Sequence, residues 1–236
     1  MYIGYFHLYI ITFISYNKVM NAFDPGRAEF APYGFTCELW NPAYMRRPDR
    51  HNEIEVNFVT QGSLTYLLGG KLAEVPCGRL CVFWASIPHQ IIAFTSDVPY
   101  HVLTLPLAWF LASRPPEDLL HTLLNGNMVA EPSTDRSVLD SALIQQWLID
   151  FTDGTDVIRA LALTEIEARL HRLAFQTAEV SLPRSHESEQ AVINSTTSRN
   201  VEEITRYIAG NYTSAITVKS IAESVGLHPN YAMELF

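Results

Sequence analysis

The chain has 236 residues, of which 48% are hydrophobic and 17% are charged, a composition that excludes an intrinsically disordered protein. Its net charge is −9 at pH 7 and its pI is about 5.3, whereas a free-standing nucleic-acid-binding protein is usually basic. The acidity argues against DNA binding as the task of the whole chain, but it allows a small DNA-binding module attached to a larger acidic domain.

Residues 1–19 form an N-terminal extension with two open interpretations. The run from Met1 to Tyr16 is mostly apolar, but no Lys or Arg precedes Lys18, so the basic start of a signal peptide is missing. The run is also shorter than the roughly 20 residues that span a bilayer, and we expect no membrane association. Either Met20 begins the folded protein, or this segment is a first β-strand packed on the domain that follows.

Residues 20–110 have the pattern of a small domain built from short strands. Glu53–Val59 alternates polar and apolar side chains, which is typical of a strand with two different faces. Gly69-Gly70 separates two further alternating runs and favours a tight hairpin. Three more runs have strand character: Arg79–Trp84, His89–Phe94 and Tyr100–Leu105. The even spacing predicts an antiparallel sandwich or barrel, and we expect this domain to be the ligand sensor.

Residues 111–180 change to a helical period. Glu117-Asp118 follows two prolines and opens a helix, Val138–Leu148 is amphipathic, and Asp156–Ala178 is the longest helix. The apolar stripe of this longest helix contains Val157, Ile158, Leu161, Ile166, Leu170 and Leu173. The stripe suits either a dimer interface or packing on the strand domain, so we expect this region to link and dimerise the protein.

Residues 181–198 are polar and rich in Ser and Thr, and we expect a linker there. The segment 199–236 then becomes helical again. Thr217 is a good N-cap for a helix, Gly226 suits the left-handed position after its end, and Pro229 opens another helix. This is the layout of a helix-turn-helix motif, although an ordinary helical hairpin has the same spacing.

The second helix of this motif would carry the contacts to DNA. It places His228, Asn230 and Met233 on outer or flanking faces, where Asn can read adenine and Met can contact thymine methyl groups. Together with the capping Thr217, these are the expected DNA-binding residues. Residues 199–236 hold three basic and four acidic side chains, which supply little of the positive charge that DNA affinity requires.

The run from Ser220 to Phe236, SIAESVGLHPNYAMELF, resembles the first helix-turn-helix of the arabinose-operon (AraC) family of regulators. That family has an all-α DNA-binding domain with two such motifs. The chain stops at Phe236, so the resemblance implies a domain truncated within its first motif, and we expect impaired operator binding by this chain alone.

The expected ligand-binding residues are His51, Glu53, Glu55, Trp84 and His89. His51, Glu53 and Glu55 share one face of a strand because side chains alternate, and His89 begins a later strand. Inward-pointing polar groups in a small barrel can bind one small ligand through its hydroxyl groups. Aromatic rings can stack on a sugar; besides Trp84, the candidates are Trp40 and Tyr66.

A metal site is the rival interpretation of the same residues. His51, His89 and either Glu53 or Glu55 would provide two imidazoles and one carboxylate for Fe or Mn. The usual metal-binding cupin pattern has His-x-His, whereas Asn52 and Glu53 follow His51 here. We therefore expect no metal or other cofactor, and a metal-dependent cupin enzyme is the alternative function. A solvated strand face is the third possibility.

The resemblance extends to the strand domain, through His51–Asn57, Leu80–Gln90 and Leu105–Leu111. These stretches resemble the cupin-type sensor of sugar-responsive AraC regulators. The resemblance implies a homodimeric activator, not an enzyme, that binds operator DNA, a sugar and RNA polymerase. The operon would be of an α-galactoside (melibiose) type. The fold implied is α+β: a cupin-like antiparallel β-barrel sensor, helices, and a partial all-α helix-turn-helix domain.

The chain contains three cysteines, Cys37, Cys77 and Cys81, and no Cys-x-x-Cys pair. The odd number argues against a disulfide scaffold and indicates a reducing compartment. Together with the missing signal peptide, it predicts a cytoplasmic protein.

Overall fold

The computed structural model describes residues 21–180, 203–204, 206–208, 211 and 215–227. The expectations for the extension 1–19, the linker 181–198 and the second helix of the helix-turn-helix motif lie outside these residues.

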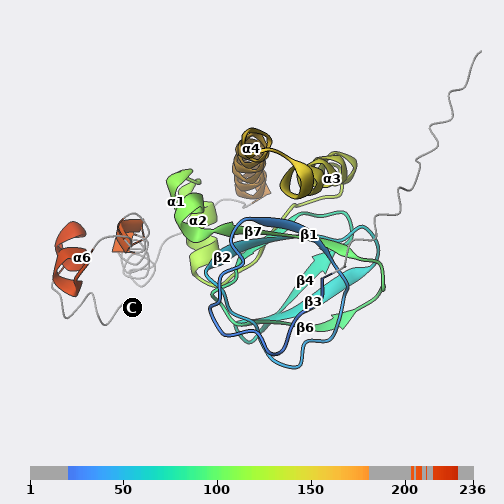
Figure 1. Ribbon diagram of the computed structural model, residues 1–236, viewed down its shortest axis with the longest axis horizontal. Helices are drawn as coiled ribbons and strands as arrows, with labels where there is room; N and C mark the ends of the chain where they lie inside the picture. Colours follow the sequence, from blue (N-terminus) through green and yellow to red (C-terminus); the bar gives the residue numbers. More distant parts are fainter. Residues whose placement is uncertain (1–20, 181–202, 205, 209–210, 212–214, 228–236) are drawn as a thin grey trace, which may run out of the picture.

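Two antiparallel sheets form the strand domain (Figure 1). The strands are β1 (Thr36–Trp40), β2 (Glu53–Phe58), β3 (Ser63–Leu68), β4 (Lys71–Pro76), β5 (Cys81–Trp84), β6 (His89–Phe94), β7 (Tyr100–Pro106) and β8 (Val129–Ala130). The order is β1-β7-β2-β5-β8 in one sheet and β4-β3-β6 in the other. The chain changes sheet after β2, β4, β5 and β6, so most consecutive strands face each other instead of pairing. This gives two facing sheets in place of the expected closed barrel.

The β3–β4 hairpin turns at the predicted glycines. Gly69 and Gly70 have φ angles of +54° and +81°, which side chains with a Cβ rarely adopt. The prediction of this hairpin is therefore confirmed. Two short strands that the sequence pattern did not indicate, β1 and β8, form the two edges of the larger sheet.

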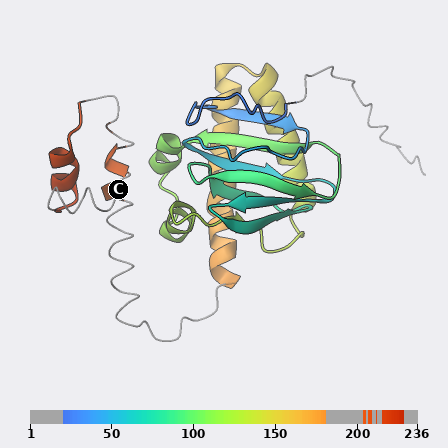
Figure 2. The ribbon, with the colours of Figure 1, turned by 90° about the horizontal axis from the view of Figure 1, so that it is seen from below.

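Four helices cover the outer face of the larger sheet (Figure 1). They are α1 (Leu107–Ala112), α2 (Glu117–Leu124), α3 (Ser137–Asp153) and α4 (Asp156–Val180). Figure 2 shows the same arrangement from below, with the strands running across the two long helices. The molecule is thus layered as helices, larger sheet and smaller sheet.

The alternation of β2 divides the interior into two cores. Ile54, Val56 and Phe58 point toward the helices, where they join a core that includes residues of α1 to α4. The opposite side chains of β2, including Glu55 and Asn57, point into the space between the two sheets and are buried there. The predicted two-faced strand is confirmed, and its polar face is internal and not solvated.

The long helix α4 has two apolar faces. Ile166, Leu170 and Leu173 are at most 2% exposed and pack in the core beneath the larger sheet. Val157 and Leu161, from the same predicted stripe, are 70% and 57% exposed. The stripe is therefore split between packing on the domain and a free surface, so only the exposed part is available to a partner.

A buried ion triad joins α4 to α3 and to the chain after β8. The Arg169 Nε donates to Asp140 Oδ1 at 2.6 Å and its Nη2 donates to Asp140 Oδ2 at 2.8 Å. The same Nη2 also donates to Glu131. All three residues are at most 3% exposed, so the helical layer is fastened to the larger sheet by charged groups inside the protein.

The first helix of the expected helix-turn-helix motif is α6 (Val218–Ser224). The Thr217 side chain accepts a hydrogen bond from the Ser220 backbone and the Ser220 hydroxyl accepts one from the Thr217 N–H. Gly226 has φ +67°, and Ala222 packs fully buried against Ile204. The predicted cap and turn are confirmed. Among the described residues, no helix is long and apolar enough to cross a membrane.

Candidate ligand pocket

A cavity lies between the two sheets and holds about 450 Å³, counting space open to solvent. The part of it that water-sized molecules can fill is about 30 Å³, well below the roughly 300–1,000 Å³ of small-molecule sites, so a larger ligand requires the lining side chains to move. Its walls combine ionisable side chains with aromatic rings. The lining residues are Phe23, Tyr33, Trp40, Asn41, Ala43, Met45, Asp49, His51, Glu55, Tyr66, His89, Ile91, Tyr100, Val102 and Thr104.

His51 lies between two carboxylates at one end of this cavity. Its Nδ1 is 2.9 Å from Glu53 Oε2 and its Nε2 is 3.2 Å from Glu55 Oε2. Burial alone would lower the pKa of His51, but the hydrogen bonds to Glu53 and Glu55 outweigh burial and raise the pKa to about 9. Burial would raise the pKa of Glu55, and the hydrogen bond from His51 is the main cause of its net lowering.

His89 approaches the same point from the smaller sheet. Its Nδ1 donates to the Ile87 carbonyl at 3.1 Å, and its Nε2 is 3.7 Å from Glu55 Oε2. The His51 and His89 rings are 5.2 Å apart and nearly perpendicular. Burial lowers the pKa of His89, so this imidazole is neutral and its inward nitrogen can accept.

Asp49 is a buried site residue that the sequence pattern did not indicate. Its carboxylate accepts from Arg27 Nη1 at 3.1 Å and from the Tyr33 hydroxyl at 3.1 Å. The Tyr33 ring lies 3.7 Å below the Arg27 guanidinium and 4.7 Å from His51. The segment before β1 thus contributes a wall of the cavity. Asp49 is separated from His51 by one residue, and this spacing could have indicated that the two side chains lie at the same site.

A network of hydrogen bonds connects Glu55 and Tyr66, which both line the cavity, through Asn57. Asn57 Nδ2 donates to Glu55 Oε1 at 2.9 Å, and the Tyr66 hydroxyl donates to Asn57 Oδ1 at 3.3 Å. Tyr66 comes from β3 in the smaller sheet and Asn57 from β2 in the larger sheet. The network therefore joins the two sheets across the cavity.

The structure brings together most of the predicted ligand-binding residues. His51, Glu55 and His89 line the cavity. Glu53 lies behind them, where it accepts from His51 and from the Gly34 backbone N–H at 3.0 Å. Trp84 does not join them. Its place on β5 points it toward the helix-side core, where its Nε1 donates to Asn52. Trp84 therefore does not line the cavity, whereas the other candidates, Trp40 and Tyr66, do.

The predicted DNA-binding residues are only partly described. Thr217 caps α6, as expected. The residues His228, Asn230 and Met233 lie outside the described part of the chain.

The chain is similar in sequence to transcription regulators. No protein-family model matches it. It is 26% identical over 200 residues to the melibiose operon regulatory proteins of Escherichia coli strain K12 and of Escherichia coli O6:H1 strain CFT073. Each alignment covers 84% of this chain and 66% of the relative, so the chain spans about two thirds of the length of these relatives.

Solved structures give a weaker likeness. The AraC-like transcriptional activator CuxR is 15% identical, with 85% of this chain and 66% of that chain covered and a TM-score of 0.43. ToxT from Vibrio cholerae is 13% identical, with coverages of 86% and 90% and a TM-score of 0.32. The sequence relatives are regulators and not enzymes, so the metal-dependent enzyme alternative gains no support. By its sequence, the chain is similar to the melibiose operon regulatory proteins of Escherichia coli.

Proposed function

We propose that the chain is a sugar-responsive transcription regulator whose ligand, an α-galactoside such as melibiose, binds between the two sheets. The observation that supports the proposal most strongly is that buried polar side chains line the cavity. His51 and Glu55 are at most 6% exposed, yet they line the cavity and do not lie in an apolar core. Buried polar groups are costly unless they are hydrogen-bonded, and a ligand rich in hydroxyl groups supplies additional partners.

The walls of the cavity also suit a sugar. Carboxylates only accept hydrogen bonds when ionised, so Asp49 and Glu55 match hydroxyl donors. The rings of Trp40 and Tyr66 provide flat apolar surfaces for the C–H face of a pyranose. The name of the sequence relatives, regulatory proteins of the melibiose operon, supports an α-galactoside as the first compound to test.

The proposed output is control of transcription in the cytoplasm. The capped helix α6 and the left-handed Gly226 support a helix-turn-helix motif. In this proposal Thr217, His228, Asn230 and Met233 lie at the DNA, and RNA polymerase is the further partner. Sugar binding would bias the placement of the DNA-binding segments, as in any allosteric coupling between two sites.

Calorimetric titration of the full chain with α- and β-galactosides tests the sugar proposal. We expect saturable binding of at least one α-galactoside. Replacing Trp40 with leucine removes an aromatic wall and should weaken binding about fivefold, since an aromatic contact contributes about 1 kcal/mol beyond its buried area.

The matched control is Trp84→Phe, because Trp84 lies on the other side of the larger sheet. This variant should bind the sugar as tightly as the unmodified chain. Equal weakening by both substitutions, or no heat with any galactoside, would contradict a sugar site between the sheets.

We also propose that a second copy of the chain covers the exposed face of α4. Exposed or half-buried residues recur at alternating steps of four and three along this helix: Val157, Leu161, Thr164, Ala168, His171 and Phe175. This spacing is that of a coiled-coil seam. Leu161 and Phe175 are 57% and 66% exposed, which leaves large apolar side chains free for a partner helix. The repeat therefore supports a homodimer.

Leu161→Glu should convert the dimer to a monomer, because it places a charge in the middle of this seam. Light scattering coupled to gel filtration measures the mass. Leu72→Glu makes the same change at a leucine of β4 that is 73% exposed, and this control should remain dimeric. A dimeric Leu161→Glu protein would remove α4 from the interface.

A further inference from the structure

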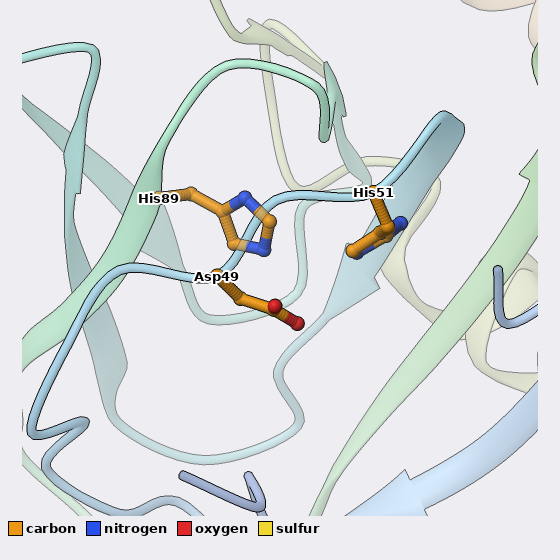
Figure 3. Close-up of side chains that lie close together, drawn as sticks. All are labelled: Asp49, His51 and His89. Carbon is orange, nitrogen blue, oxygen red and sulfur yellow. The ribbon is translucent and has the colours of Figure 1, made fainter. Parts of the chain in front are cut away.

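Three ionisable side chains from two segments of the chain converge at one end of the cavity (Figure 3). Asp49, His51 and His89 are each at most 3% exposed, and a potential ligand atom of each lies within 4.8 Å of the others. Asp49 and His51 precede β2 and His89 begins β6, so the fold of the two sheets creates this cluster. Glu55 from β2 adds a second carboxylate to it.

The separations of the donor atoms fit a single ion. Glu55 Oε2 is 3.2 Å from His51 Nε2 and 3.7 Å from His89 Nε2. Ligands about 2.1 Å from one metal lie about 3.0 Å apart at a right angle and about 3.4 Å apart at a tetrahedral angle. Both separations are close to these values, and the ligand atoms of Asp49, His51 and His89 lie within 4.8 Å of one another, so one cation can bind among these side chains once they adjust their positions.

The outward nitrogens of both histidines are already fixed. His51 Nδ1 donates to Glu53 and His89 Nδ1 donates to the Ile87 carbonyl. A carboxylate or carbonyl that holds one imidazole nitrogen, and so orients the other as a ligand, is the usual support of a metal-binding histidine. Both inward Nε2 atoms are thereby aimed at Glu55.

The charges of the cluster also favour a cation. Asp49, Glu53 and Glu55 are buried carboxylates, and Arg27 is the fixed cation that pairs with one of them, Asp49. An uncompensated charge is costly inside a protein. A divalent cation between Glu55 and the two histidines would offset part of this negative charge.

We propose that His51 Nε2, His89 Nε2 and Glu55 Oε2 form a binding site for a first-row divalent transition metal, with Asp49 as the adjacent fourth ligand. Two imidazoles and a carboxylate suit iron, manganese or zinc. The remaining coordination positions face the cavity, where an oxygen atom of a bound molecule can occupy them. The proposal stands on the cluster itself, whichever molecule fills the cavity.

The full chain is first treated with a chelator to remove bound metal, and the chelator is then removed. The protein is titrated with Zn²⁺ and separately with Mn²⁺, in the absence of sugar. We expect one ion per chain by elemental analysis after gel filtration, and a higher melting temperature, because binding to the native state stabilises it. His89→Ala and Glu55→Gln should each lower the affinity at least tenfold. Glu53→Gln, which only loosens the His51 ring, should lower it about tenfold.

His121→Ala and Cys77→Ser remove exposed metal-binding groups outside the cavity and should leave the affinity unchanged. Circular dichroism verifies that each variant is folded. If a variant of a proposed ligand does not fold, the metal affinity of Glu53→Gln tests the proposal instead. Binding that survives in the folded site variants, binding that disappears with His121 or Cys77, or no binding at micromolar metal would each overturn the proposal. None of these results depends on whether a sugar binds.

Discussion

Replacing Arg169 with leucine should lower the free energy of unfolding by about 3–5 kcal/mol, as the removal of one partner from a buried ion pair does. Arg169 is 3% exposed, and its guanidinium provides the hydrogen bonds to Asp140 and Glu131, which are both 1% exposed. Without it, two carboxylates stay buried close together with no cation. Urea unfolding followed by circular dichroism measures the loss.

Arg159→Leu is the matched control on the same helix. The Arg159 side chain is 44% exposed and pairs with a fully exposed Asp156, so its loss should cost less than about 0.5 kcal/mol. A triple variant with Arg169→Met, Asp140→Leu and Glu131→Leu should recover most of the lost stability, since apolar replacement of a whole buried ion cluster is often neutral. If Arg169→Leu were no worse than Arg159→Leu, the triad would contribute nothing to stability.

The strands of the domain were predictable where the sequence alternates. β2 needed only its period of two, and Gly69-Gly70 marked the β3–β4 hairpin. The strand β8 has only two residues, too few for a period to be visible, and β1 and β8 form the edges of the larger sheet by pairing with β7 and β5. Helix α1 was missed since it starts directly after β7 with no capping side chain.

The site was predictable along one strand and less so across the fold. The spacing of His51, Glu53 and Glu55 predicted their shared face, and the structure adds His89 as expected. Trp84 lies away from the cavity because its side of β5 follows from the pairing of Trp84 with Ile54, which no local sequence pattern reveals. Asp49 is held at the cavity by hydrogen bonds from Arg27 and Tyr33. These residues are distant from Asp49 in the sequence, so no local pattern indicates the contact.

The two faces of α4 illustrate the same limit. A stripe of apolar residues shows that a helix is covered, but not what covers each part of it. Leu170 packs inside the domain while Leu161 is free, and only the packing of α3 and the larger sheet makes this division. The exposed repeat of Leu161, Ala168 and Phe175, each seven residues apart, became visible once the buried residues were known.

Acidification should destabilise the protein in part through His101. This residue of β7 is 5% exposed and faces the helix side beside the Phe58 ring, and burial lowers its pKa to about 4. In the unfolded chain its pKa is about 6.5, so between pH 6.5 and pH 4 the unfolded state binds a proton that the folded state does not. The stability that His101 contributes is thus complete above pH 6.5 and is lost as the pH falls through this window.

The loss attributable to His101 should reach about 2 kcal/mol at pH 4.5. Other buried groups also respond to acid, so the quantity to measure is a difference. Urea unfolding at pH 7 and at pH 4.5 gives the drop in the free energy of unfolding for the unmodified chain and for His101→Phe. This drop should be about 2 kcal/mol smaller in His101→Phe than in the unmodified chain. His121→Phe, which changes an exposed histidine of α2, should keep the full drop. Equal drops in the unmodified chain and in His101→Phe would mean that His101 takes up its proton in the folded protein as readily as in the unfolded chain, and that its place beside Phe58 does not exclude the charged form.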